Sequence, residues 1–102
     1  MAEHYLYRLQ ATRPMMLSEG PTLEEVAVIE QHSAYLKALA EKGVVTFGGR
    51  TLNSDETAFG IVVLSGDSED AARHIMENDP AVRDGVLRAD LYPFRIAYVG
   101  KA

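Results

Sequence analysis

Two residues in this sequence combine the side-chain types that proton transfer requires, a histidine and a carboxylate, at places that stability alone would not choose. His32 falls on the apolar side of the longest predicted helix, and Asp79 closes the second helix, where the helix dipole disfavours a negative charge. Histidine exchanges protons near neutral pH, and a carboxylate partner holds its ring in one tautomer. If the fold brings the two side chains together, they form a His–Asp dyad suited to general acid–base catalysis.

Both residues also have structural explanations that the sequence leaves open. His32 could pack at the edge of the core beside Val28, Tyr35 and Leu36. Asp79 precedes a proline, and this pair is a common start of a short helical turn, so its carboxylate could serve as an N-cap. The two roles of Asp79 are compatible if one carboxylate oxygen caps the turn while the other holds the imidazole.

The segment around Gly48-Gly49 supplies candidates for substrate binding. Glycines at the end of a strand let a ligand approach the backbone closely, which makes Gly49 a candidate contact. Arg50 follows directly and could hold a carboxylate through two parallel hydrogen bonds, although a solvated arginine at a hairpin fits the sequence equally well. Tyr7 in the first strand is a weaker candidate, for which packing in the core or in an interface is favoured.

The loop over Arg13–Pro21 carries Met15, Met16 and Leu17 where a solvated loop would be polar. Flexible apolar side chains of this kind suit a lid over a pocket. A packed loop or a dimer contact explains the same composition.

Other forms of chemistry have little support in the sequence. The chain contains no cysteine, which excludes disulfides, thiolate metal sites and cysteine nucleophiles. His4, His32 and His74 lack the spacing of a metal site, and His74 falls on the outer face of its helix. No phosphate-binding loop, dinucleotide-binding glycine pattern or G-x-S-x-G elbow is present. We therefore expect neither a metal nor an organic cofactor.

Apolar periodicity and turn signals predict two helices and four strands. Thr22 and Glu25 form a capping box at the start of the first helix, and Gly43 supplies its left-handed end. In chain order, the predicted elements are a strand at His4–Gln10, a helix at Leu23–Lys42, a hairpin of strands at Val44–Thr51 and Thr57–Ser65, a helix from a cap at Asp67 or Ser68 to Asp79-Pro80, and a strand at Val86–Val99 interrupted by Pro93. This β-α-β-β-α-β order is that of a ferredoxin-like α+β fold, an antiparallel sheet with two helices on one face.

Length and charge limit the classes of function. A chain of 102 residues is long enough for one hydrophobic core, so we expect a single domain over residues 1–102. The net charge of −5 disfavours nucleic-acid binding and docking on anionic membranes. No stretch has the pattern of a membrane span or an export signal, so we expect a cytoplasmic protein.

The third predicted strand is apolar on both faces. Phe59, Ile61 and Val63 point one way, whereas Val62 and Leu64 point the other. Two helices can cover only one face of the sheet, and an uncovered apolar face is normally an interface. We therefore expect a homodimer that packs sheet against sheet.

With the order of elements and the His–Asp pair in place, the sequence resembles the YCII-related family of small dimeric α/β-barrel proteins. The resemblance rests on an ordered set of short motifs that spans nearly the whole chain, none of them specific alone. These motifs are Gln31-His32-Ser33-Ala34-Tyr35-Leu36 in the first helix, Gly43 with the strand through Gly48-Gly49, Ser68-Glu69-Asp70-Ala71-Ala72 at the start of the second helix, Asp79-Pro80 with Gly85, and Tyr92-Pro93-Phe94. The chain departs from the commoner pattern at Ala81, where an aromatic residue often follows Asp-Pro, and at Arg50, where many members have proline.

The resemblance implies a ferredoxin-like dimer with a cleft near a His–Asp pair, which corresponds here to His32 and Asp79. Dehydrochlorinase and muconolactone-isomerase-like roles are associated with relatives, and most members have no assigned reaction. We therefore expect a cofactor-independent enzyme that transfers protons on a small molecule, an isomerase or a lyase. A dimer that binds a small ligand or a protein without catalysis is the alternative, and a purely structural dimer is a third.

Overall fold

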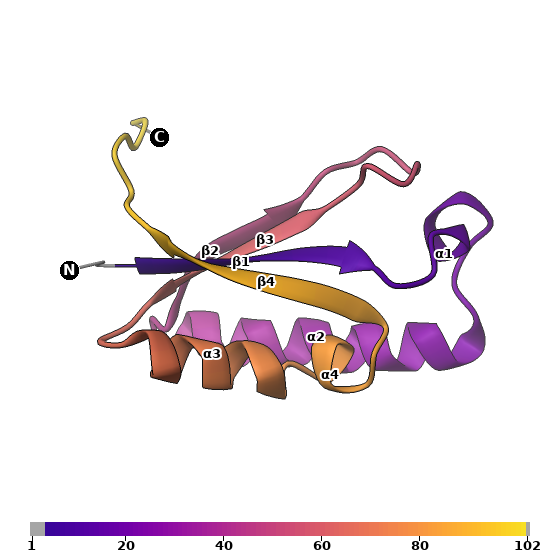
Figure 1. Ribbon diagram of the computed structural model, residues 1–102, viewed down its shortest axis with the longest axis horizontal. Coiled ribbons are helices and arrows are strands. Elements are labelled where there is room, and N and C mark those ends of the chain that lie inside the picture. Colours follow the sequence, from indigo (N-terminus) through magenta and orange to yellow (C-terminus); the bar gives the residue numbers. More distant parts are fainter. Residues whose placement is uncertain (1–3, 102) are drawn as a thin grey trace.

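The computed structural model describes residues 4–101 and contains a four-stranded antiparallel sheet with helices packed on one side of it (Figure 1). In chain order, its elements are β1 (His4–Ala11), α1 (Met15–Ser18), α2 (Leu23–Glu41), β2 (Val45–Arg50), β3 (Gly60–Ser65), α3 (Glu69–Asn78), α4 (Pro80–Arg83) and β4 (Leu87–Phe94). The strand order β2-β3-β1-β4 is the ferredoxin-like arrangement. The predicted fold is confirmed, with the single-turn helices α1 and α4 as additions. None of the helices in this part of the chain is both long and apolar enough to cross a membrane.

Local signals determine where the helices begin and end. The Glu25 amide donates to the Thr22 hydroxyl at 3.1 Å, and the Thr22 amide donates to the Glu25 carboxylate at 2.8 Å, which confirms the predicted capping box of α2. Ser68 caps α3 by accepting a hydrogen bond from the Ala71 amide. After α2, Gly43 adopts a φ of +77°, a left-handed conformation that residues with side chains rarely take. The chain therefore leaves α2 at a fixed point and turns directly into β2.

Three strands are shorter than the sequence predicts, β2 by one residue at each end and β3 and β4 by more. β3 begins at Gly60, and the Asp55 carboxylate accepts hydrogen bonds from both the amide and the hydroxyl of Thr57, which hold Thr57 in the turn before the strand. β4 ends at Phe94, which pairs with His4 at the first position of β1. Residues 95–101 form no strand.

Side chains of the sheet alternate between a face that α2, α3 and α4 cover and an open face (Figure 1). On the covered face, Tyr5, Tyr7 and Leu9 of β1 are buried. They form the core together with Val45, Val62, Leu64, Ala72 and Met76. This core fixes α3 and α4 against β1, and it therefore fixes the turn between these helices.

The open face of the sheet is apolar as well. Val63 lies at its centre, paired with Leu6 of β1 on one side and with Phe47 of β2 on the other, and it is fully buried. Phe47, Phe59 and Tyr92 on the same face remain 46%, 39% and 45% exposed. The helices thus leave uncovered the second apolar face that the sequence of the third strand predicts.

Candidate active site

The structure brings together the two residues that the sequence singles out for proton transfer. The Nδ1 atom of His32, on α2, lies 2.7 Å from Oδ1 and 2.9 Å from Oδ2 of Asp79. Asp79 is fully buried, and the side chain of His32 is 13% exposed. Because such surroundings screen charge poorly, the carboxylate interacts strongly with the imidazole.

The backbone around Asp79 explains why a carboxylate occupies this position. Asp79 ends α3 and begins α4, where its Oδ1 accepts a hydrogen bond from the Ala81 amide at 3.0 Å and Pro80 takes the first helical position. The cap and the contact with His32 are therefore both present. Oδ1 takes part in both of them, so the two oxygens do not divide the roles as the sequence suggests.

Tyr7 supplies a third hydrogen bond to Asp79. Its hydroxyl donates to Oδ2 at 2.8 Å from a fully buried position on β1. Burial, and then the charge of Asp79, raise the pKa of Tyr7 well above its ordinary range, so the hydroxyl stays protonated and remains a donor. Tyr7 supports the carboxylate that holds His32, and it is not among the residues that line the cavity beside that histidine. Its contact with a substrate stays a prediction.

These hydrogen bonds determine which nitrogen of His32 is available to a ligand. With Asp79 as the acceptor, the neutral ring carries its proton on Nδ1, and Nε2 keeps its lone pair. Within residues 4–101, the hydrogen bonds of the ring all involve Nδ1. An imidazole in this state can accept a proton at Nε2 while Asp79 stabilises the resulting cation.

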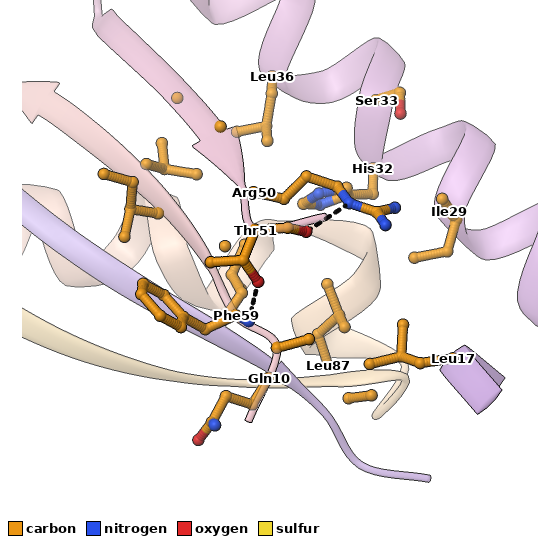
Figure 2. A pocket seen from close by; sticks show the side chains of 18 of the residues that line it. Gln10, Leu17, Ile29, His32, Ser33, Leu36, Arg50, Thr51, Phe59 and Leu87 are labelled. Carbon is orange, nitrogen blue, oxygen red and sulfur yellow. Dashed lines mark hydrogen bonds between the residues drawn. The ribbon is translucent and has the colours of Figure 1, made fainter. Parts of the chain in front are cut away.

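A cavity of about 540 Å³, which we call the helix–sheet cavity, opens between α2 and the sheet beside His32 (Figure 2). Its size is typical of small-molecule sites, which span roughly 300–1,000 Å³. The space exists because Gly48 and Gly60 occupy helix-facing positions of β2 and β3, where other residues would place side chains. A Cβ atom on Gly48 would lie 3.1 Å from the Ile61 carbonyl oxygen, and one on Gly60 would lie 3.3 Å from the Gly49 carbonyl oxygen.

A β-bulge in β2 directs Arg50 into the helix–sheet cavity. Val45 pairs with Leu64 on the covered face, but Phe47 pairs with Val63 on the open face, so the residue between them reverses the alternation. Arg50 therefore points to the covered side, where it lines the cavity and extends toward α2 (Figure 2). Without the bulge, strict alternation would turn Arg50 to the open face.

Gly49 contributes backbone to the same cavity, but its missing side chain does not create space there. Gly49 pairs with Ile61 on the open face, and an added Cβ would meet no atom within 4 Å. Gly48 and Gly60 are the helix-facing glycines, and a side chain at either position would also be tight against the backbone of the neighbouring strand. The sequence gives no direct signal for Gly60, because its importance depends on which strand residues stand beneath α2.

The loop between β1 and α2 packs over one end of the helix–sheet cavity. Met16 is buried and lines the cavity with Leu17, whereas Met15 is half-exposed. Arg13 ties this loop to α2, because its Nε and Nη2 donate to the Glu25 carboxylate at 3.0 and 2.6 Å. The apolar composition of the loop is therefore explained by packing, and its opening as a lid stays a prediction.

The ion pair between Arg13 and Glu25 should make a pH-dependent contribution to stability. Hydrogen bonds from Arg13, and then from the Thr22 amide, lower the pKa of Glu25 to about 2 from an ordinary value of 4.5. A carboxyl with a lowered pKa in the folded state stabilises the fold above its unfolded pKa, and this contribution is lost as the pH falls through the folded value. Glu25→Gln keeps a capping side chain and should be less stable than the wild type at neutral pH.

Urea denaturation at a series of pH values measures this difference. The gap in free energy of unfolding between the wild type and Glu25→Gln should shrink as the pH falls from 4.5 toward 2. A gap of the same size throughout that range would contradict the prediction.

The other two histidines lie away from the helix–sheet cavity. His74 is exposed on α3, as the sequence predicts, and His4 is half-buried on the open face of the sheet. Among the described residues, no three histidine, aspartate or glutamate side chains lie close enough together to hold a metal ion.

The fold and the site together define a ferredoxin-like α+β domain with a small-molecule cavity beside a buried histidine–carboxylate pair. The family model of the YCII-related domain matches residues 6–95, and the chain belongs to this family. No curated protein matches the sequence. Among solved structures, the chain is similar to 5-chloro-2-hydroxyhydroquinone dehydrochlorinase (TftG) from Burkholderia phenoliruptrix AC1100, in complex with 2,5-dihydroxybenzoquinone. The two chains are 22% identical with a TM-score of 0.65, over 91% of this chain and 95% of that one, and this likeness confirms the fold.

Proposed function

We propose that this protein is an enzyme that transfers a proton on a small molecule without a cofactor, in an isomerisation or an elimination. The observation that carries the proposal is the placement of His32, whose Nδ1 is held by buried Asp79 while the ring lines a cavity of small-molecule size. Nε2 would take a proton from an acidic carbon or oxygen of the substrate, and Asp79 would stabilise the imidazolium that forms. His32 is the catalytic residue in this scheme, and Asp79 orients it.

The similarity to a dehydrochlorinase supports this class of reaction. That protein is named for the dehydrochlorination of 5-chloro-2-hydroxyhydroquinone, and its structure holds 2,5-dihydroxybenzoquinone. Dehydrochlorination is an elimination that includes removal of a proton, the step that an aspartate-oriented histidine can perform. At 22% identity, the proposal extends to the class of reaction and not to the substrate.

Binding of a small ligand without catalysis is the second candidate function. One feature of the helix–sheet cavity favours it, because His32 is the one histidine among the described residues that line it and none of them is aspartate or glutamate. The other polar lining residues, all within the described chain, are Gln10, Ser33, Lys37, Arg50 and Thr51. An isomerase built on this site would therefore use His32 both to remove and to return the proton, whereas an elimination needs His32 only to remove it.

Deuterium exchange separates the two candidates. The protein is incubated in D2O with a panel of small carbon acids and chlorinated hydroxyarenes, and proton NMR follows deuterium incorporation while chloride release is measured in parallel. Protein-dependent exchange or elimination that His32→Gln abolishes supports the enzyme. Ligands that bind the helix–sheet cavity but undergo neither reaction would instead support the binding module.

We further propose that the open face of the sheet forms the interface of a homodimer. Phe47 and Tyr92 are nearly half-exposed there around buried Val63, and an uncovered apolar surface of this kind is typical of an interface. Light scattering after size-exclusion chromatography should give twice the mass of the chain at micromolar concentration. The double substitution of Phe47→Glu and Tyr92→Glu should give a monomer, whereas Leu23→Glu, at an exposed position of α2, should not. A monomeric wild type would contradict the proposal.

A further inference from the structure

The charges that line the helix–sheet cavity are opposite in sign to the charge of the chain. The sequence has 15 acidic and 10 basic residues and a net charge of −5. Among the lining residues, which all belong to the described chain, Lys37 and Arg50 are cationic, and none is aspartate or glutamate. A concave surface with charge of one sign focuses its field on a ligand of the opposite sign. The cavity is therefore suited to an anion.

Arg50 is the group best placed to bind this anion. Its Nε donates to the carbonyl oxygen of neighbouring Thr51 at 3.2 Å, which anchors the side chain at one end. Within residues 4–101, Arg50 takes part in no ion pair, and its two Nη atoms form no hydrogen bond. Figure 2 shows the guanidinium extending across the cavity toward the side of α2 that carries His32 and Ile29. A planar group with two unused amino groups matches a flat oxyanion through two parallel hydrogen bonds.

The rest of the helix–sheet cavity favours a ligand that is apolar apart from its oxyanion. Its walls come from the sheet, from α2 and from the loop that holds α1, and their larger apolar side chains include Leu9, Met16, Ile29, Leu36, Phe59 and Leu87. The missing side chains of Gly48 and Gly60 leave room for a ring between these walls. A ligand that fits both features carries one oxyanion on a compact apolar body.

We propose that Arg50 binds the oxyanion of a small organic anion, such as an aromatic carboxylate, and so places its apolar body beside the ring of His32. The inference deepens the proposed function. It rests on that function in one respect only, namely that the bound anion is the substrate of the proposed reaction. Binding of the anion itself requires no catalysis, so the two proposals can fail separately.

Benzoate and benzamide test the proposal because they have nearly the same shape and differ in charge. Their affinities are measured by NMR titration of the nitrogen-15-labelled protein, in which the perturbed amides also locate the bound probe. Benzoate should bind the wild type at least about tenfold more tightly than benzamide, with the largest changes in α2 and around Arg50 in β2. Equal affinities for the two probes would overturn the proposal.

Three variants test whether Arg50 is the reason that benzoate binds more tightly than benzamide. Arg50→Gln should abolish it, and Arg50→Lys should restore part of it, because an ammonium keeps the charge but not the planar donor pair. Arg73→Gln is the matched control, since Arg73 is exposed on α3 and pairs with Glu69 at 3.3 Å. An undiminished preference in Arg50→Gln would overturn the role of Arg50.

His32→Gln distinguishes this inference from the proposed function. The variant should keep the preference for benzoate, because Arg50 and the apolar walls are unchanged. Anion binding that depends on Arg50, in a protein that exchanges no proton, would uphold the inference and contradict only the proposed catalysis. Turnover that depends on His32, with no preference for benzoate, would overturn the inference alone.

Discussion

Replacing His32 with glutamine should lower the rate of protein-dependent deuterium exchange or elimination by a factor of about 10²–10⁴, the usual contribution of a positioned general acid or base. Glutamine can still donate a hydrogen bond to Asp79, but its amide cannot accept and release a proton near neutral pH. Since the cavity and Arg50 are retained, substrate binding should change much less than turnover. The exchange assay in D2O measures the rate, and the NMR titration measures the binding.

Two further variants separate the loss of a base from a loss of structure. His74→Gln changes an exposed histidine on α3 and should leave the rate at the wild-type value. Asp79→Asn removes the charge that keeps the proton of His32 on Nδ1, so nitrogen-15 shifts of the ring should report a changed balance of tautomers, and the rate should fall. Wild-type turnover in His32→Gln would exclude His32 as the catalytic residue.

The fold could be predicted from the sequence because its determinants are local. The capping box of Thr22 and Glu25 involves residues three positions apart, and Gly43 marks the end of the same helix wherever the helix packs. The apolar character of both faces of β3 also lies within one strand. The boundary of β3 was less predictable, because the hydrogen bonds from Thr57 to Asp55 compete with strand pairing for the same residues.

The site could be predicted only where a residue is unusual for its own position. His32 and Asp79 meet this condition, each being slightly unfavourable in its helix. Tyr7 does not, because an alternating aromatic residue in a strand has the pattern of a core residue, and its bond to Asp79 joins positions 72 residues apart. Only the packing of α3 and α4 against β1 shows that the hydroxyl meets a carboxylate.

The face of the sheet to which the Arg50 side chain points depends on a β-bulge, which the sequence of β2 does not predict. Reading β2 by simple alternation places Arg50 opposite in orientation to Val45, on the open face. The bulge after Val45 reverses this orientation and turns Arg50 toward α2. Bulges often occur next to active sites, where they re-aim a side chain. A single unpaired residue thus decides whether the cavity contains a guanidinium.

The largest loss of stability should follow from replacing Asp79 with alanine, because an unpaired buried donor costs about 1–3 kcal/mol and a lost N-cap costs about 1 kcal/mol more. The substitution leaves the fully buried Tyr7 hydroxyl without its acceptor, removes the N-cap of α4 and frees Nδ1 of His32. Asp79→Asn should cost less, because asparagine keeps an acceptor oxygen and is a good N-cap. Urea denaturation followed by circular dichroism measures both losses.

A double-mutant cycle with Tyr7→Phe tests whether the Tyr7 hydroxyl is the reason for this loss. Phenylalanine fills the same space on β1 but has no hydroxyl to leave unpaired, so Asp79→Ala should cost about 1–3 kcal/mol less in that background. Strictly additive losses would show that the 2.8 Å bond between Tyr7 and Asp79 contributes nothing to stability. Coupling of the predicted size would instead mean that β1 holds the carboxylate in place before any ligand arrives. Tyr7 would then act on His32 through Asp79, from a fully buried position on β1.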